Sequence, residues 1–384
     1  LMKRKSTSAV VAAACLAASC VQAAVTVTGP KPFGKLSDGR ETHIWRIDSG
    51  NGLILDVTDY GGRLVRAYAP DRHGNLADVT LGWNTAAEYE TYGFSMGTLV
   101  GRYANRIADG RFTLDGVAYR LPINENKPNR HNTLHGGPEG WSQKVWKVQP
   151  YQAASEAGLV LACISKDGEM GFPGTVTATI TYRVTADNRW IIDYEATTDR
   201  PTVINLTHHS YWNLAGEASG DVRKQEIQIF ADAYTQTDEG LIPTKNAPVE
   251  GTGMDFRQMR PIDARASLMA AEKAFAPMDN WYDHNFVLRG KTGEMHPAAT
   301  LYDPVSGRVL EIQTTEPCMQ MYGAQNMTSD LPAKAAGKKL CPFAGVALET
   351  QHYPDSPNHP EFPTTVLRPG ETFKSRTQYR FTAR

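Results

Sequence analysis

Short runs in which apolar and polar residues alternate, each bounded by turn residues, constrain the fold of this chain more than any other feature. A period of two is the pattern of a β-strand with one buried and one exposed face. Thr, Val, Ile and Tyr, which favour strands, are frequent in these runs. The predicted strands are residues 53–58, 111–115, 159–164, 175–184, 190–197, 226–230, 309–314 and 372–381.

Helix signals are few. The best candidate spans residues 262–275, with Asp263 as a possible N-cap. The 33 glycines and 23 prolines are spread along the chain, so they supply turns rather than a disordered tract. Many strands, short turns and little helix predict an all-β fold, a large sandwich of antiparallel sheets. Because no internal repeat or linker is visible, we expect residues 24–384 to form one domain.

The first 23 residues have the pattern of a secretory signal peptide. Lys3, Arg4 and Lys5 precede a small, apolar stretch over residues 6–19, and residues 21–23 offer a small-x-small cleavage site. The apolar stretch is too short to span a bilayer comfortably. We therefore expect export to the periplasm, with a lipoprotein anchored at Cys20 as the alternative.

Charge and cysteine content exclude several classes of function. Without Lys3, Arg4 and Lys5, 37 basic residues face 41 acidic ones, and no basic stripe suggests nucleic acid or an anionic membrane as a partner. The remaining cysteines, Cys163, Cys318 and Cys341, are too few for a disulfide framework and match no zinc motif. A Cys318–Cys341 disulfide and two buried thiols both remain open.

The segment 205–214, Asn-Leu-Thr-His-His-Ser-Tyr-Trp-Asn-Leu, is the strongest candidate for chemistry. Imidazole titrates near neutral pH, and here it stands among flat rings, a hydroxyl and an amide, which suit a sugar. In an extended chain His208 and His209 point to opposite sides, as do Tyr211 and Trp212. Only one of the two histidines can therefore act as the acid, and the doublet is unsuited to chelating a metal.

A second segment supplies a lone carboxylate. Glu349 follows the apolar run 343–348, and we expect it to close a buried strand. A charge there is costly unless it is paired or functional, and burial would raise its pKa toward that of a usable base. Four prolines stiffen the loop that follows, residues 354–363, and we expect this loop to wall the site. A histidine and this glutamate could form an acid–base pair; a hydrogen-bonded core histidine and a structural ion pair are the alternatives.

Other polar residues are candidates for binding a ligand with many hydroxyl groups. Asn105 and Arg106 follow a stretch of small residues and offer hydrogen-bond donors. His135 lies in Leu-His-Gly-Gly, where glycine lets the backbone approach a ligand closely. Asp283 adds an acceptor beside aromatic residues, and Gln320 adds an amide. Taken alone, each is as readily an ion pair or an ordinary loop or strand residue.

Motifs for a metal or a cofactor are missing from the sequence. His131 and His135 have the i,i+4 spacing of a helical metal site, but the residues between them and the glycine pair that follows argue against a helix. No nucleophile elbow, phosphate loop or HExxH pattern is present. We therefore expect neither a metal nor a cofactor.

Six short motifs in order resemble aldose 1-epimerase, also called galactose mutarotase. They are GRYANRI, LHGG, NLTHHSYWNL, DHNF, EPCMQMY and ALETQHYPDSPNHP, and the resemblance extends from about residue 33 to residue 382. It implies that residues 24–384 form a β-supersandwich which interconverts the α and β anomers of free hexoses without a cofactor. It also implies that His209 is the general acid and Glu349 the general base, and that Asn105, Arg106, His135, Asp283 and Gln320 hold the sugar hydroxyls.

This chain departs from the family pattern in three places. His208 stands where many relatives carry asparagine, Cys318 replaces a glycine before Gln320, and the stretch 125–133 before LHGG is longer than usual. We expect the longer stretch to alter the rim of the site and the choice of substrate. The partner is a small monosaccharide, and we expect a monomer or a homodimer with no membrane span. The alternatives are a hexose-6-phosphate epimerase, a non-catalytic sugar-binding module and a glycoside hydrolase.

Overall fold

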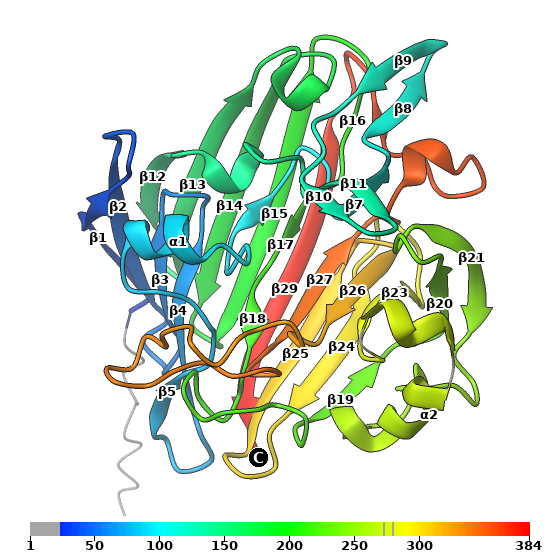
Figure 1. Ribbon diagram of the computed structural model, residues 1–384. Coiled ribbons are helices and arrows are strands. Elements are labelled where there is room, and N and C mark those ends of the chain that lie inside the picture. Colours follow the sequence, from blue (N-terminus) through cyan, green and yellow to red (C-terminus); the bar gives the residue numbers. More distant parts are fainter. Residues whose placement is uncertain (1–23, 272, 279) are drawn as a thin grey trace, which may run out of the picture.

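The largest element of the fold is a nine-stranded sheet. It is seen in the computed structural model, which describes residues 24–271, 273–278 and 280–384 (Figure 1). The predicted signal peptide lies outside the described residues. In sheet order the strands are β12 (Lys147–Gln152), β13 (Glu156–Ser165), β14 (Val176–Thr185), β15 (Arg189–Thr198), β29 (Phe373–Ala383), β25 (Arg308–Thr314), β24 (His296–Tyr302), β19 (Glu226–Ile229) and β22 (Arg260–Pro261).

A six-stranded sheet packs against one face of the nine-stranded sheet (Figure 1). Trp212 joins the two, because its ring lies 5.5 Å from that of Tyr379 and 5.6 Å from that of Phe381, both on β29. Large apolar side chains from both sheets fill the space between them, which accounts for most of the core. The strands are β18 (Tyr211–Trp212), β27 (Val346–Gln351), β26 (Cys318–Tyr322), β23 (Asp283–Leu288), β20 (Ala231–Thr237) and β21 (Pro243–Pro248).

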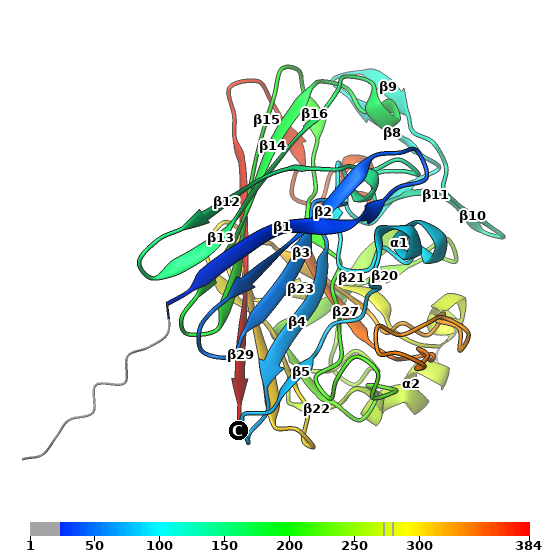
Figure 2. The same cartoon turned by 90° about the vertical axis from the view of Figure 1, so that its left-hand side faces the viewer.

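A five-stranded meander near the N-terminus forms the third layer, and Figure 2 shows it from its exposed side. Its strands run in sequence order, each paired with the next in antiparallel fashion. A second apolar cluster, which includes Trp83 and Tyr89, packs beneath it. The strands are β1 (Thr26–Lys35), β2 (Glu41–Asp48), β3 (Ile54–Thr58), β4 (Leu64–Pro70) and β5 (Leu76–Asp78).

Several short strands pair outside the three larger sheets, and some of them border a polar pocket. The most relevant is a hairpin of β10 (Glu125–Lys127) and β11 (Arg130–Leu134), which pairs through β11 with β7 (Arg106–Ala108). The other short pairs are β8 (Arg111–Leu114) with β9 (Val117–Arg120), β17 (Thr207–His208) with β6 (Leu99–Val100), and β16 (Thr202–Val203) with β28 (Val366–Leu367).

Among the described residues, α-helix is confined to α1 (Ala86–Tyr92) and α2 (Ala266–Ala271). The predicted helix over 262–275 is broken, because α2 is flanked by 3₁₀ turns at Ile262–Arg265 and Lys273–Met278. Asp263 is not its cap; it forms an ion pair with Lys224 at 2.7 Å. Helix α1 escaped prediction although Thr85 and Glu88 form a capping box, the signal that could have found it.

The predicted all-β sandwich is confirmed. Each of the eight predicted runs overlaps a strand of the structure, with bounds that differ by only a few residues. Cys163, Cys318 and Cys341 are free thiols, so the disulfide left open by the sequence does not form. The assignment of residues 24–384 to one domain stays a prediction.

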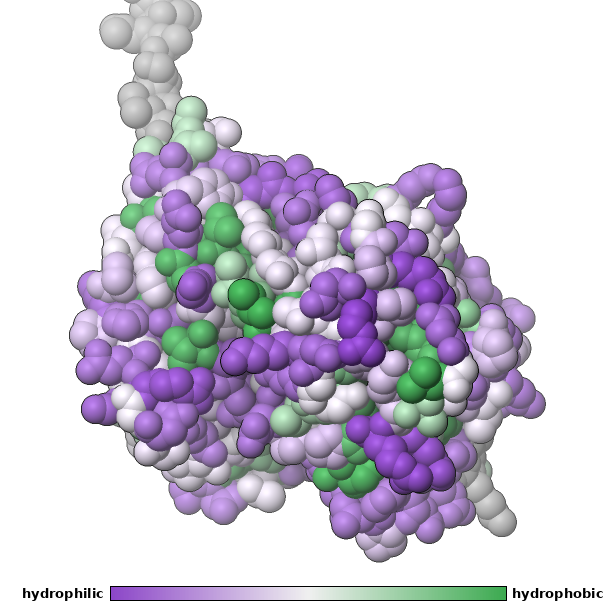
Figure 3. All heavy atoms as spheres, turned by 90° about the horizontal axis from the view of Figure 1, so that it is seen from above, coloured by the Kyte–Doolittle hydropathy of each residue, from purple (hydrophilic) through white to green (hydrophobic). Residues whose placement is uncertain are grey.

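Hydrophilic residues cover most of the face seen in Figure 3, and the apolar ones lie in small scattered groups. Large exposed apolar side chains such as Ile164 and Val305 belong to separate strands and loops. Among the described residues, no helix is both long and apolar enough to cross a membrane.

Candidate active site

The floor of the pocket is the face of the six-stranded sheet that is turned away from the nine-stranded sheet. Residues directly opposite each other in antiparallel strands share a face. Gln320 on β26 lies opposite Glu349 on β27, and Asp283 on β23 lies opposite Tyr322 on β26. All four line one pocket, whereas Leu348, the neighbour of Glu349, points into the core. The period of two therefore brings carboxylates and an amide together from three strands.

His209 completes the floor from the segment between β17 and β18. Its backbone N–H donates to the carbonyl of Thr98 at 2.9 Å, and its own carbonyl accepts from Gly97 at 2.8 Å. These bonds fix the direction of the side chain, which lines the pocket. His208 points the other way, with its ring 4.9 Å from that of Trp190 in the core. The predicted opposite orientation of the two histidines is confirmed.

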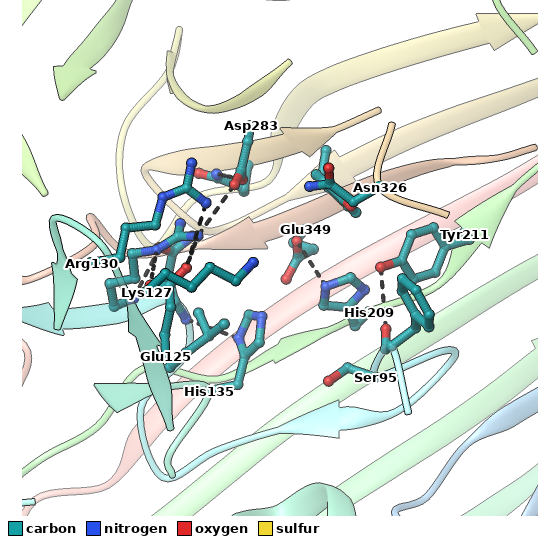
Figure 4. Close-up of a pocket in the computed structure, with 16 residues that line it drawn as sticks. Ser95, Glu125, Lys127, Arg130, His135, His209, Tyr211, Asp283, Asn326 and Glu349 are labelled. Atoms are coloured by element: carbon teal, nitrogen blue, oxygen red, sulfur yellow. Dashed lines mark hydrogen bonds and ion pairs between the residues drawn. The ribbon is translucent and has the colours of Figure 1, made fainter. Parts of the chain in front are cut away.

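His209 and Glu349 face each other across the floor (Figure 4). Nε2 of His209 lies 3.4 Å from Oε1 of Glu349, and both side chains are buried. Within the described part of the chain, Nδ1 of His209 and Oε2 of Glu349 have no hydrogen-bond partner. A buried polar atom without a partner is costly, so these atoms are available to a ligand.

Burial disfavours the charged form of both groups. It lowers the pKa of His209 to about 4. It also raises the pKa of Glu349 well above its ordinary value, and the nearby Asp283 carboxylate adds to that shift. Burial therefore favours a neutral imidazole beside a neutral carboxyl, and the pKa of Glu349 has moved in the predicted direction.

One wall of the pocket is an ion-pair network centred on Arg106. Its Nε and Nη2 donate to the two carboxylate oxygens of Glu125 at 2.8 and 3.0 Å, and Nη2 also lies 3.3 Å from Oδ2 of Asp283. Gln320 donates to the other oxygen of Asp283 at 2.6 Å. Burial alone would lower the pKa of Arg106, but Asp283 and Glu125 together raise it. The network fixes three of the predicted binding side chains.

His135 stands at the end of β11 beside His209. The two rings are perpendicular, with centroids 5.2 Å apart. The backbone N–H of Asn105 donates to Nδ1 of His135 at 3.2 Å, so the proton of the neutral ring is on Nε2. Burial lowers the pKa of His135 well below its ordinary value, and His209 and Arg106 add to the shift. His135 is therefore a neutral hydrogen-bond donor.

His135 needs the turn that follows it, because Gly136 has a φ of 81° and passes close to another backbone segment. A Cβ at Gly136 would lie 2.2 Å from the carbonyl oxygen of Gly101. A residue with a side chain would move the turn, and His135 with it.

Ligand atoms of His135, His209 and Glu349 lie within 4.8 Å of one another, which is close enough to consider a metal. The tautomer of His135 opposes this use, because Nδ1 accepts a hydrogen bond and Nε2 carries the proton. The group suits hydrogen bonding to a ligand better than it suits metal coordination.

The structure brings all seven predicted site residues together around one pocket of about 330 Å³. A pocket of this size is typical of small-molecule sites. The sequence did not identify the pocket residues of the β10–β11 hairpin or of irregular segments, although the Lys-Pro-Asn-Arg turn signal was visible in the hairpin. Tyr211 on β18 and Tyr322 on β26 also line the pocket, and of these Tyr211 stood in the candidate segment 205–214. The additional lining residues are Phe94, Ser95, Glu125, Lys127, Arg130, Leu134, Tyr211, Tyr322 and Asn326.

Two predictions about the segment after Glu349 are wrong. Glu349 does not end its strand, because β27 continues to Gln351. The proline-rich loop 354–363 supplies none of the pocket residues and lies behind the wall instead. There Asp355 accepts from the backbone of Ala108 at 3.0 Å and donates its own N–H to the carbonyl of Arg106 at 2.9 Å. The loop therefore supports Arg106 rather than covering a ligand.

Comparisons with known proteins agree with this geometry. A sequence model of the family described as aldose 1-epimerase matches residues 43–380. The aldose 1-epimerase of Escherichia coli (strain K12) is 37% identical over 349 residues, which are 90% of this chain and 97% of that protein. The galactose mutarotase of Rattus norvegicus is 37% identical over 351 residues, 91% of this chain and 97% of that protein. The crystal structure of an aldose epimerase homologue from C. elegans superposes with a TM-score of 0.75 at 29% identity, covering 87% of this chain and 96% of that one.

Proposed function

We propose that this chain, which belongs to the aldose 1-epimerase family, interconverts the α and β anomers of free hexoses such as glucose and galactose. The observation that carries the proposal is the buried pair of His209 and Glu349, 3.4 Å apart on the floor of a polar pocket. Anomer exchange consists of two proton transfers and a bond rotation. An acid and a base that face one cavity supply both transfers.

In the proposed reaction, Glu349 takes the proton of the anomeric hydroxyl while His209 gives a proton to the ring oxygen. The bond between C1 and the ring oxygen breaks, and the open-chain aldehyde forms. Rotation about the C1–C2 bond presents the other face of the carbonyl. Closure reverses both proton transfers, so Glu349 then acts as the acid and His209 as the base, and the pair ends as it began.

The reactive form of the pair has Glu349 ionised and His209 protonated. It contains the same number of protons as the neutral form that burial favours, and differs only by moving one proton across 3.4 Å. A hydrogen bond from a sugar hydroxyl to the unpartnered Oε2 of Glu349, and one from the protonated Nδ1 of His209 to a sugar oxygen, would stabilise the charged form. The pair therefore titrates as a unit rather than as two independent groups.

The remaining predicted residues are proposed to orient the sugar. Nε2–H of His135 donates beside His209. Asn105 uses its side-chain oxygen to accept from the backbone N–H of Arg106 at 2.9 Å, which leaves its amide group for the ligand. Arg106, Asp283 and Gln320 fix one another and present their free donors and lone pairs to the hydroxyls. Fixed polar groups of this kind reduce the entropy lost on binding.

The alternative functions fit the pocket less well. A hexose-6-phosphate needs several uncompensated cations, but Arg106 is already paired with Glu125 and Asp283. A glycoside hydrolase needs two carboxylates free to flank the bond, but Asp283 is held by Arg106 and Gln320. A non-catalytic binding module leaves the buried, unpartnered atoms of His209 and Glu349 without a role.

The test is polarimetry of freshly dissolved α-D-glucose and α-D-galactose with wild type and with Glu349→Gln. We expect acceleration by wild type and its near-total loss in the variant, since a positioned acid or base contributes about 10²- to 10⁴-fold. The matched control is Glu311→Gln on β25, whose half-exposed side chain forms an ion pair with Arg380. Full activity in Glu349→Gln would show that another group is the base. If wild type accelerated anomer exchange of neither sugar, the proposed function would be overturned.

We also propose export to the periplasm and a monomeric or homodimeric state. The basic, small and apolar character of residues 1–23 supports export. N-terminal sequencing of the protein recovered from cell fractions tests it: a cytoplasmic protein that retains residues 1–23 would contradict it. Light scattering after size-exclusion chromatography measures the oligomeric state.

A further inference from the structure

The β10–β11 hairpin places two cations on the pocket side of one turn. Lys127 and Arg130 are directly opposed in the hairpin, so their side chains lie on the same face. Both line the pocket, and Figure 4 shows the side chain of Lys127 reaching into it. Asn126 and His131 lie on the other face, where their side chains contact each other at 3.1 Å.

The turn that holds these cations is anchored. Pro128 and Asn129 connect the strands, and Asn129 adopts a φ of 64°, which asparagine tolerates in turns. Its amide donates to Glu239 at 2.8 Å, and Asn132 donates to the carbonyl of Gly240 at 2.9 Å. Like charges directly opposed in a hairpin are destabilising, so an anion beside the pair would relieve the repulsion.

Only part of that compensation comes from the protein. Arg130 lies 3.9 Å from Glu125 and donates to the carbonyl of Pro277, and Glu125 also neutralises Arg106. Within the ranges that the structure describes, no ion pair involves Lys127. Three cations, Arg106, Lys127 and Arg130, line the pocket, and the two arginines already contact the Glu125 carboxylate. Lys127 is thus a pocket cation without a carboxylate partner among the described residues, although the whole chain has a formal net charge of −1.

We infer that the pocket takes hexuronic acids, such as D-galacturonic acid, and that Lys127 binds their carboxylate. This inference rests on the proposed function, because the anomeric centre would react as in a neutral hexose while the carboxylate remains unchanged. One uncompensated cation matches one negative charge. A phosphate dianion would need a second free cation, and both arginines are already engaged.

The experiment compares kcat/KM for anomer exchange of D-galacturonate and of D-galactose, each corrected for the uncatalysed rate, in low-salt buffer. We expect wild type to prefer the uronate. In Lys127→Ala the uronate-to-hexose ratio should fall about five- to tenfold, as for a partly solvated ion pair. In Lys127→Glu it should fall further. Added salt should lower the wild-type ratio, since it screens exposed charges.

The matched control is Lys147→Ala, an exposed lysine on β12 of the nine-stranded sheet, which should keep the wild-type ratio. An unchanged ratio in both Lys127 variants, with galactose still converted, would overturn the uronate assignment and leave the proposed function intact. Preference for D-glucose 6-phosphate over galacturonate would overturn the assignment to a single negative charge. Failure to accelerate either galactose or galacturonate would instead overturn the proposed function itself.

Discussion

The floor and the wall of the pocket both contain buried ionisable side chains, but burial and partners act on their charges in opposite ways. On the floor, His209 and Glu349 are buried, and each has an atom without a partner among the described residues. On the wall, Arg106 is bound at two atoms to Glu125 and at one to Asp283. The groups of the wall are held in their charged forms by partners, whereas burial favours the neutral forms of the two groups on the floor.

The pKa shifts follow this difference. On the floor, burial pushes both partners toward their neutral forms. On the wall, burial opposes the charge of Glu125, but Arg106 outweighs it and lowers the pKa of that carboxyl. Burial therefore favours the neutral form of a carboxyl that lacks a cationic partner, and a partner such as Arg106 reverses that preference.

The largest effect should come from removing the acid on the floor. His209→Gln should lower kcat about 10²- to 10⁴-fold, because it removes one proton donor and acceptor, with little change in stability. His208→Gln is the matched control, since His208 packs on Trp190 in the core and contacts Ser210 at 2.9 Å. That variant should lose stability while kcat remains within a few-fold of wild type. Equal losses of kcat in both variants, measured by polarimetry, would contradict the assignment of His209 to the reaction and of His208 to the core.

Disrupting the wall should lower the free energy of unfolding, by an amount comparable to the rise in activation free energy expected for His209→Gln. Arg106→Met leaves Glu125 and Asp283 without their main partner, and breaking a buried ion pair costs about 3–5 kcal/mol of unfolding free energy. Urea unfolding followed by circular dichroism measures it. The double variant Arg106→Met/Glu125→Gln should regain part of the loss, because it removes the uncompensated charge. Additive losses would show that the two side chains are not coupled.

Glu349→Gln should change the free energy of unfolding by a smaller amount, and it should stabilise rather than destabilise the protein. Burial raises the pKa of Glu349 above its ordinary value of 4.5, so its contribution to stability is complete below pH 4.5 and is lost as the pH rises through the folded pKa. Glu349→Gln should therefore unfold like wild type near pH 4 and be more stable by about 0.5–2 kcal/mol in neutral and alkaline solution. A stability difference that shrinks with rising pH would contradict this account of the floor.

The strands could be predicted because each depends on a local pattern. Alternation of apolar and polar residues identified β14, β15 and β29, which the structure places side by side. The helices were harder, since α1 and α2 are short and part of their stability comes from packing. The broken helix around α2 shows that a helical pattern does not determine whether a turn closes as α-helix or as 3₁₀-helix.

The chemistry of the site could also be predicted in part. Residues with catalytic potential stood out by their type and by the motifs around them, and the period of two correctly separated His208 from His209. Glu125, Lys127 and Arg130 did not stand out, because charged residues in a polar stretch are usually solvated. Only the pairing of β7 with β11 reveals that their hairpin faces Glu349.

The sequence alone determined the class of fold and the pair that carries the proposed chemistry, since both follow from residue type and from spacing along the chain. The tertiary structure decided which ionisable side chains of the site have a partner of opposite charge. Arg106 meets Asp283 from a strand 177 positions away, and His209 meets Glu349 from 140 positions away. Charge compensation and burial depend on distances in space, which spacing along the chain does not contain.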